Sequence, residues 1–260
     1  MGCVIVTGAV GGIGQALVRT FAEAGHPVIG ADIAAQPDDL PADQFIQCDL
    51  ARTVEDPKYA AEVFSSIRTA LKGRPLDALI NNAAVQILGK IEDLDRTGWR
   101  KTLQVNLLAP FFWTQAFLSV LESSAGCVIN ISSIHARLTK PSFVAYATSK
   151  AALSGMTRAM AIDAGYRVRI YGVEPAAIDT QMLREGFSHN PRKFLSLMDH
   201  HPAGTIGTPG DLASIALFLC RQKTQFLTGT VVQVDGAISA CLHDPDCVFL
   251  GTSPPSNEVK

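Results

Sequence analysis

Three side chains that could move a proton together lie in one part of the chain: Ser133, Tyr146 and Lys150. Tyr146 and Lys150 are four residues apart, about one helical turn, so they are expected on one face of a helix. A free tyrosine has a pKa of about 10, and a nearby ammonium lowers it by favouring the phenolate. A serine hydroxyl can hydrogen-bond the oxygen that gains or loses the proton. The trio could therefore interconvert an alcohol and a carbonyl near neutral pH.

The spacing alone is weak evidence, because so short a motif occurs by chance in many helices. The alternative is a helix with one half-buried tyrosine and one solvated lysine. The chain has 260 residues, of which 47% are apolar and 18% charged, as is typical of a single globular domain. Its formal net charge of −2 gives no sign of nucleic acid or an anionic membrane as a partner.

The six cysteines form no Cys-x-x-Cys pair and no zinc-like cluster with histidine, so no metal site is expected. Cys3, Cys48 and Cys127 fall in apolar runs and are interpreted as small core residues in a reducing compartment. No apolar run approaches the roughly 18 residues that span a bilayer. No basic region precedes the first apolar run, unlike in a signal peptide. We therefore expect a cytoplasmic protein.

Short apolar runs alternate with helical patterns, which predicts an α/β fold with a parallel sheet covered on both faces. The expected strands cover residues 3–6, 27–31, 45–48, 76–80, 127–131, 168–173 and 230–234. Helices are expected up to residue 21 and over 59–71, 99–121, 146–163 and 211–221. Residues 1–240 are expected to form one domain. Within it, residues 183–209 are rich in proline and glycine and are expected to form a substrate lid with a short helix over 192–198. Residues 241–260 are expected to form an irregular tail.

A glycine-rich turn, residues 7–14, follows the first strand and opens a helix. Glycines there allow the backbone to approach a phosphate, and helix N-terminal amides favour the anion. Asp32 ends the second strand, where a carboxylate can bind ribose hydroxyls and repel a 2′-phosphate. With no lysine or arginine in the turn, NAD is favoured over NADP. Asp49 ends the third strand, within reach of an adenine amino group, although either aspartate could simply be a cap or turn residue.

Together these features resemble the short-chain dehydrogenase/reductase family over nearly the whole chain. The matching segments are residues 7–14, Asp32, Asp49-Leu50, Asn81-Asn82-Ala83-Ala84, Asn106, Ser133, Tyr146-x-x-x-Lys150, Pro175 with Ile178 and Thr180, and Val234-Asp235-Gly236. The resemblance implies one doubly wound Rossmann-type domain with a seven-stranded parallel sheet of order 3-2-1-4-5-6-7. It also implies hydride transfer at a nicotinamide, and a homotetramer or homodimer. The residues it assigns to the cofactor are Gly8, Gly11, Gly12, Ile13, Gly14, Asp32, Asp49, Leu50, Asn82, Ala83, Tyr146, Lys150, Pro175, Ile178 and Thr180.

The resemblance also implies catalytic roles. Tyr146 would be the general acid/base, and Lys150 would lower its pKa and hold the nicotinamide ribose. Ser133 would polarise the substrate oxygen, and Asn106 would support Lys150 through a bound water. The chain departs from the family at Ala84, Ala176 and Ala237, where glycine is usual, and at Tyr171, where asparagine is frequent. These departures bear on backbone shape more than on proton transfer.

The sequence therefore predicts an NAD-dependent oxidoreductase that interconverts a secondary alcohol and a ketone. One alternative is an acyl-thioester ketoreductase of the same family, against which Asp32 argues because such enzymes usually take NADPH. The other is a non-catalytic NAD-binding regulator, against which the intact trio argues. His135 is a candidate to recognise a polar substrate group or to titrate near neutrality, and Gln86 and Arg184 are further substrate candidates. Each of the three could instead be an ordinary loop or solvated residue.

Overall fold

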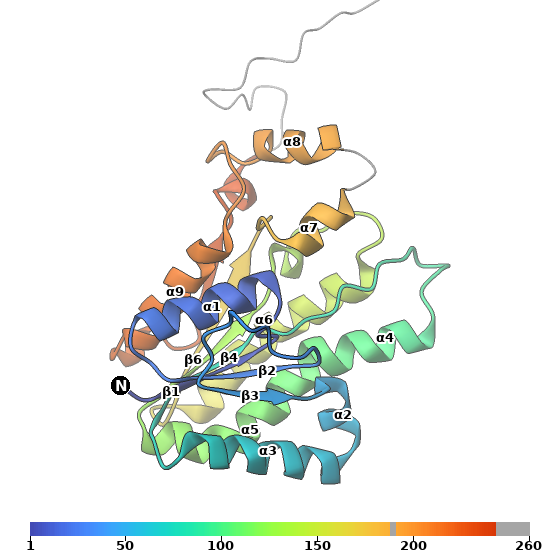
Figure 1. The fold of residues 1–260 in the computed structure, drawn as a ribbon. Coiled ribbons are helices and arrows are strands. Elements are labelled where there is room, and N and C mark those ends of the chain that lie inside the picture. Colours follow the sequence, from blue (N-terminus) through green and yellow to red (C-terminus); the bar gives the residue numbers. More distant parts are fainter. Residues whose placement is uncertain (188–190, 243–260) are drawn as a thin grey trace, which may run out of the picture.

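The computed structural model describes residues 1–187 and 191–242 (Figure 1). Its strands are β1 Cys3–Thr7, β2 Val28–Asp32, β3 Gln44–Gln47, β4 Leu76–Asn81, β5 Cys127–Ile131, β6 Arg169–Pro175 and β7 Val231–Val234. They form one parallel sheet in the order β3-β2-β1-β4-β5-β6-β7. The predicted fold class and strand order are therefore confirmed.

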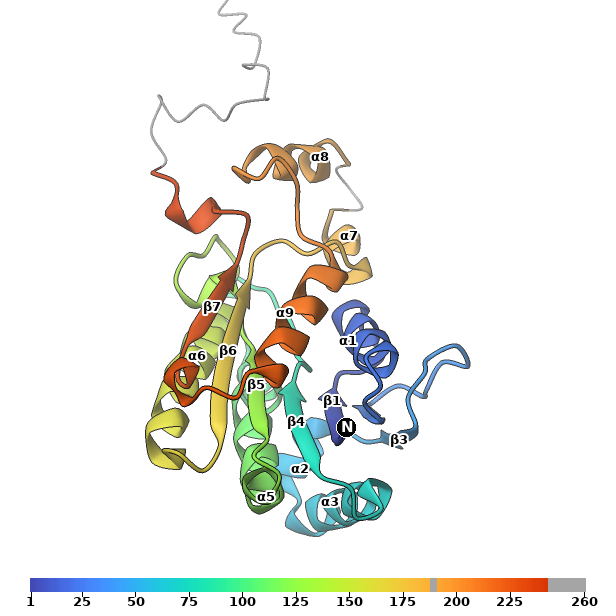
Figure 2. The ribbon, with the colours of Figure 1, turned by 90° about the vertical axis from the view of Figure 1, so that its left-hand side faces the viewer.

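Helices cover both faces of this sheet (Figure 2). The α-helices are α1 Gly12–Glu23, α2 Leu50–Glu55, α3 Pro57–Leu71, α4 Arg96–Leu103, α5 Ala109–Ser123, α6 Val144–Ala164, α7 Gln181–Gly186, α8 Pro191–Asp199 and α9 Pro209–Arg221. The shorter elements are the π-helical turn η1 Gln104–Leu108 and the 3₁₀ turns η2 Ile134–Ala136, η3 Gln225–Leu227 and η4 Ile238–Ala240. None of the helices in the described part of the chain is long and apolar enough to cross a membrane.

The two faces of β1 show how the sequence builds two cores. Cys3 and Ile5 join the core on the side of α3 and α5, whereas Val4 and Val6 join the core on the side of α1 and α9. Side chains alternate between the faces of a strand, so an unbroken apolar run is needed when both faces are covered. Because residues 3–6 are buried on both faces, this run holds β1 in the interior of the sheet.

The predicted helix over 99–121 is wrong in one respect, because a π-helical turn interrupts it. Pro110 lies in the first turn of α5, just after η1. A proline has no N–H to donate and its ring collides with the carbonyl four residues earlier, here that of Asn106. The helix therefore widens at this point, and such π turns are frequent at functional sites.

Two short helices lie at one end of the molecule in both views, α7 and α8 (Figures 1 and 2). They follow the carboxyl end of β6, and α8 confirms the short helix predicted over residues 192–198. A lid over 183–209 stays a prediction, as does the tail, of which only residues 241–242 lie within the described part of the chain. Since ligands of open α/β sheets bind at the carboxyl ends of the strands, the site is expected at this end.

Candidate active site

The glycine turn is locked to the segment that follows β4. The Nδ2 atom of Asn82 donates to the carbonyl oxygens of Thr7 and Gly8, both at 3.0 Å. In return, Thr7 Oγ1 accepts from the main-chain nitrogens of Asn82 and Ala83, at 3.0 and 3.2 Å. Gly8 has a φ of +65°, and a Cβ there would lie 2.7 Å from the Cα of Ala83. Asn82 and Ala83 thus shape the turn from a distant part of the sequence.

The glycines at the start of α1 allow close contacts that a side chain would prevent. A Cβ on Gly14 would lie 1.9 Å from the oxygen of Gly8, and one on Gly12 would lie 3.1 Å from Cγ2 of Thr180. Gly11 caps the helix without a side-chain hydrogen bond, and the first turn, which includes the half-buried Ile13, carries no acidic residue. The first amides of α1 are therefore open to an anion, which fits a dinucleotide phosphate.

The two strand-end aspartates lie in different surroundings. Asp32 accepts hydrogen bonds from the main-chain nitrogens of Val10 at 2.9 Å and Ala34 at 3.0 Å, so its carboxylate lies beside the glycine turn. Asp49 caps α2 by accepting from the nitrogen of Ala51 at 2.8 Å, and it also pairs with Lys101 at 3.4 Å. The capping alternative is thus present at Asp49, and its neighbour Leu50 is buried.

Asn106 lies fully buried in the π-helical turn. Its Oδ1 accepts from the nitrogen of Val85 at 2.8 Å, and its Nδ2 donates to the oxygen of Val85 at 2.9 Å and to Ser149 Oγ at 3.0 Å. The side chain therefore ties the segment after β4 to helix α6. The water-mediated contact with Lys150 stays a prediction.

The trio of Ser133, Tyr146 and Lys150 comes together at the carboxyl end of β5. Ser133 and Lys150 are buried and Tyr146 is half-buried. Ser133 lies close enough to Tyr146 to lower the pKa of its phenol, and Lys150 Nζ donates to the oxygen of Ile131 at 2.8 Å. Lys150 Nζ also lies 5.8 Å from the centre of the Tyr146 ring. The spacing in the sequence thus gave the right juxtaposition.

Burial, not charge, dominates the electrostatics of the trio. Desolvation raises the pKa of Tyr146, although Ser133 lowers it in part. Desolvation also lowers the pKa of Lys150 to about 7. A lowering of the Tyr146 pKa by the charge of Lys150 stays a prediction, since burial is the largest influence on both groups.

The segment after β6 approaches the start of α1. Pro175 is the buried last residue of β6, and Ile178 is buried and forms a bridge with Gly207. Thr180 caps α7 by accepting from the nitrogen of Leu183 at 3.3 Å, and its methyl group faces Gly12. The structure thus brings Ile178 and Thr180 to the same crevice as the glycine turn.

Three departures from the family pattern differ in their structural consequences. Ala176 continues the sheet by donating to the oxygen of Val234 at 3.1 Å, so it needs no glycine. Tyr171 is fully buried in the core on the side of α9. Ala237 has a φ of +67°, in the left-handed region that favours glycine. Only at Ala237 does the alanine carry a conformational cost.

His135 is brought beside the trio, as predicted. Its ring stacks on Phe143 with centroids 4.3 Å apart, and it meets Tyr146 edge-on at 5.7 Å. Nδ1 lies 3.0 Å from Oγ1 of Thr139. Burial, helped by the charge of Lys140, lowers the pKa of His135 to about 4. Titration near neutrality, one of the two roles considered, is thus contradicted, and the ring is neutral at pH 7.

Substrate contacts of the other two candidates, Gln86 and Arg184, stay a prediction. Arg184 makes a two-pronged ion pair with Asp179, with Nε and the terminal nitrogen 2.7 and 2.6 Å from the two carboxylate oxygens. This pair raises the pKa of Arg184 and engages its guanidinium, although the side chain is 64% exposed. Gln86 is exposed.

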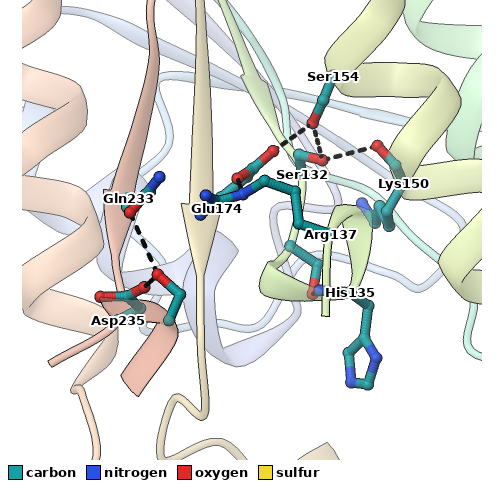
Figure 3. A network of polar contacts seen from close by, with 10 residues as sticks. Ser132, His135, Arg137, Lys150, Ser154, Glu174, Gln233 and Asp235 are labelled. Atoms are coloured by element: carbon teal, nitrogen blue, oxygen red, sulfur yellow. Dashed lines mark hydrogen bonds and ion pairs between the residues drawn. The ribbon is translucent and has the colours of Figure 1, made fainter. Parts of the chain in front are cut away.

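The sequence reasoning missed a buried charge at the carboxyl end of β6. Glu174 is almost fully buried, yet it stands between Val173 and Pro175 in an apolar strand. It pairs with Arg137, whose Nε lies 2.9 Å from Oε2 (Figure 3). A charged residue inside a buried strand is the signal that could have revealed it, because such a group needs a partner.

Comparisons with known proteins agree with this geometry. A protein-family model described as enoyl-(acyl carrier protein) reductase matches residues 8–239. Galactitol 2-dehydrogenase (L-tagatose-forming) of Cereibacter sphaeroides is 31% identical over 238 residues, which cover 90% of this chain and 93% of the relative.

Two solved structures have the same fold over almost their full length. The ligand-free aldohexose dehydrogenase of Thermoplasma acidophilum superposes with a TM-score of 0.86 at 30% identity, covering 94% of this chain and 96% of the other. A 4-hydroxyisoleucine dehydrogenase in complex with NADH gives a TM-score of 0.81 at 28% identity, covering 93% and 100%. The chain therefore belongs to the short-chain dehydrogenase/reductase family of oxidoreductases, whose members include dehydrogenases that act on alcohols.

Proposed function

We propose that this protein is an NAD-dependent dehydrogenase that interconverts a secondary alcohol and a ketone. The observation that carries the proposal is the convergence of Ser133, Tyr146 and Lys150, with Lys150 Nζ 5.8 Å from the centre of the Tyr146 ring and with Ser133 and Lys150 buried. The Tyr146 hydroxyl lies on the same helix as this lysine, at the carboxyl end of the sheet where the glycine turn also lies. A phenol, a serine hydroxyl and an amine so placed provide a route for one proton.

Each of the three residues has its own role in this reaction. Tyr146 takes the proton of the substrate hydroxyl in oxidation and returns it in reduction. Ser133 hydrogen-bonds the reacting oxygen and holds it in place. Lys150 is buried with a pKa of about 7, so it can exist in either protonation state near neutral pH and stabilise the phenolate when charged. Bound NAD supplies the hydride acceptor.

The preference for NAD rests on Asp32. Its carboxylate lies beside the glycine turn and would repel a 2′-phosphate, and residues 8–14 contain no lysine or arginine to neutralise that group. Gly8, Gly11, Gly12, Ile13 and Gly14 would hold the pyrophosphate, and Pro175, Ile178 and Thr180 would flank the nicotinamide. Asp49 is a weaker adenine contact, because it already caps α2 and pairs with Lys101.

A polar, hydroxylated substrate is supported by His135. The ring is neutral at pH 7 and fixed by Phe143 and Thr139, so its Nε2 can hydrogen-bond a substrate hydroxyl without adding charge. The galactitol and aldohexose dehydrogenases are named for polyhydroxylated substrates, which agrees with this role.

Replacement of Tyr146 by phenylalanine tests the proposal. Tyr146→Phe should lower turnover about 10²–10⁴-fold, with NADH affinity measured by fluorescence titration unchanged. Tyr166→Phe is the matched control, because Tyr166 is 86% exposed and lies beyond the end of α6. Turnover is followed by NADH absorbance over a panel of polyols, sugars, simple secondary alcohols and their ketones.

Three outcomes would contradict the proposal. Full activity of Tyr146→Phe would remove Tyr146 from catalysis. NADH binding without turnover of any compound would favour a non-catalytic regulator. Faster reduction of a 3-oxoacyl thioester with NADPH than of any ketone with NADH would favour the ketoreductase alternative.

A further inference from the structure

A buried carboxylate lies directly behind the segment that carries Ser133. Glu174 Oε2 accepts from Nε of Arg137 at 2.9 Å, and Oε1 accepts from Oγ of Ser154 at 2.8 Å (Figure 3). Ser133 precedes the η2 turn and Arg137 follows it, and Glu174 directly precedes Pro175. The ion pair therefore joins the segment of the candidate catalytic serine to the segment proposed to flank the nicotinamide.

The hydroxyl groups on the other side of Glu174 extend this connection. Ser154 Oγ lies 2.7 Å from Ser132 Oγ, which in turn lies 3.0 Å from the main-chain oxygen of Lys150. Because Ser154 donates its proton to Glu174, the proton of Ser132 goes either to Ser154 Oγ or to the oxygen of Lys150. All three side chains, of Ser132, Ser154 and Glu174, are buried. The carboxylate thus reaches the residue before Ser133 and the backbone of the helix that carries Tyr146 and Lys150.

Arg137 is also held from the side of β7. When the amide of Gln233 has its oxygen toward Arg137, that oxygen accepts from both terminal nitrogens, at 2.6 and 2.7 Å. Its nitrogen then donates to Oγ of Ser239 at 3.2 Å, and Ser239 in turn donates to Asp235. Figure 3 shows these side chains, with Gln233 and Asp235 on one side of Glu174 and Ser132 and Lys150 on the other.

A buried carboxylate is a costly way to fill a strand position, even when its partner, here the 43% exposed side chain of Arg137, reaches solvent. Apolar residues of similar volume often stabilise a fold as well or better, whereas removal of one partner leaves an unpaired buried charge. What an ion pair adds is direction, because the guanidinium fork meets its acceptors only in fixed geometries. Here Arg137, which follows β5, contacts Glu174 on β6 and Gln233 on β7, so its guanidinium fixes how the ends of these three strands lie.

We propose that Arg137 and Glu174 are positioning residues that hold Ser133 at its working distance from the nicotinamide-flanking segment. The inference rests on the proposed function, since it concerns the geometry of that reaction. Neither residue touches the reacting atoms, so each acts through Ser133 and residues 175–178. A displacement of about 1 Å at a catalytic group can cost about 100-fold in rate.

The first test compares Arg137→Gln and Glu174→Gln with Arg167→Gln. Within the described residues, Arg167 hydrogen-bonds main-chain oxygens at the end of α6, near the amino end of β6, so it controls for loss of an arginine. We expect kcat to fall about 10- to 100-fold in the two site variants, with NADH affinity within about 2-fold because the glycine turn is untouched. The primary deuterium isotope effect on kcat should rise, because hydride transfer becomes limiting.

A double variant separates positioning from stability. Arg137→Met with Glu174→Met leaves no unpaired charge, so its thermal midpoint should return toward that of the unaltered protein. If the pair positions Ser133, kcat stays low although stability is restored. Recovery of kcat together with stability would show that the pair is only structural and would overturn the inference, as would an unchanged kcat in Arg137→Gln.

Amide hydrogen exchange gives a readout that does not depend on a substrate. In Arg137→Gln, exchange should become faster in peptides that cover residues 131–138 and 173–178, and stay unchanged in residues 3–14. Unchanged exchange in both site segments would overturn the inference even if no substrate were known. Failure of the unaltered protein to turn over any alcohol would instead contradict the proposed function and leave the exchange result as the test of the pair.

Discussion

Two regions of the site are built in different ways: the cofactor half, which is the glycine turn of residues 7–14 with Asn82 and Ala83, and the substrate rim, which is His135 with Arg184. In the cofactor half, Thr7 and Asn82 exchange hydrogen bonds with main-chain groups, and Gly14 allows a backbone contact that no other residue permits. On the rim, His135 is held by a stacked ring, and Arg184 by an exposed ion pair. Cofactor binding is thus a property of the scaffold, whereas substrate recognition depends on side chains that can change without loss of the fold.

The largest effect is expected at Gly14. In Gly14→Ala the new Cβ would lie 1.9 Å from the oxygen of Gly8, so the turn must move. We expect the free energy of unfolding to fall by about 1–3 kcal/mol and NADH binding, measured by fluorescence titration, to be lost. Gly155→Ala is the control: nothing lies within 4 Å of its Cβ, and a helical alanine should stabilise α6 by up to about 1 kcal/mol. Normal NADH binding by Gly14→Ala would show that the cofactor half is as tolerant as the rim.

The next largest effect is expected when Asp32→Ala is combined with Ile33→Arg. Ile33 is 61% exposed at the end of β2, so an arginine there can reach a 2′-phosphate. A hydrogen bond to a charged group contributes about 1.5–3 kcal/mol, which corresponds to a gain of about 10- to 100-fold in kcat/KM with NADP. Steady-state kinetics with both cofactors measure the switch. A preference for NADP in the unaltered protein would contradict the role of Asp32.

Lys150 should make the stability of the ligand-free protein depend on pH. Its pKa is about 7 when folded and 10.5 when unfolded, so between these values the unfolded chain binds more protons. Stability therefore rises with pH across this window, by at most about 1.4 kcal/mol per pH unit, and the gain is lost as pH falls toward 7. Urea unfolding at pH 7, 8 and 9 should show a steeper rise for the unaltered protein than for Lys150→Met. Parallel slopes would mean that Lys150 is not desolvated.

The smallest effect is expected on the rim, at His135. His135→Gln should raise KM about 2- to 10-fold with little change in stability, because one hydrogen bond to substrate contributes about 0.5–1.5 kcal/mol. Since the pKa of His135 is about 4, its contribution to KM should be constant between pH 6 and 8. A change in KM over that range that disappears in His135→Gln would show that the imidazole titrates near neutrality after all.

The strand order followed from the resemblance to the family, whereas the residues themselves predicted the parallel sheet, the glycine turn and the Ser133–Tyr146–Lys150 trio. These depend on local patterns: apolar runs that fill both faces of a parallel sheet, glycines at a strand–helix turn, and two residues one helical turn apart. The helix over 99–121 was predicted without its π turn, although Pro110 is visible in the sequence. Its effect falls on Asn106, and spacing alone does not show that this side chain would be held by Val85.

Tertiary structure alone decided the electrostatics and the partners. Tyr146 and Lys150 have shifted pKa values because the fold desolvates them, and burial of a single residue depends on contacts made by distant segments. The partner of Arg184, Asp179, was likewise shown by the structure and not by the sequence. Glu174 and Arg137, separated by 37 residues, meet only once β5 and β6 are side by side. Strands, helices and turns depend on residues that are neighbours in the sequence. The charge state and the partner of a buried group depend instead on the packing of the whole chain.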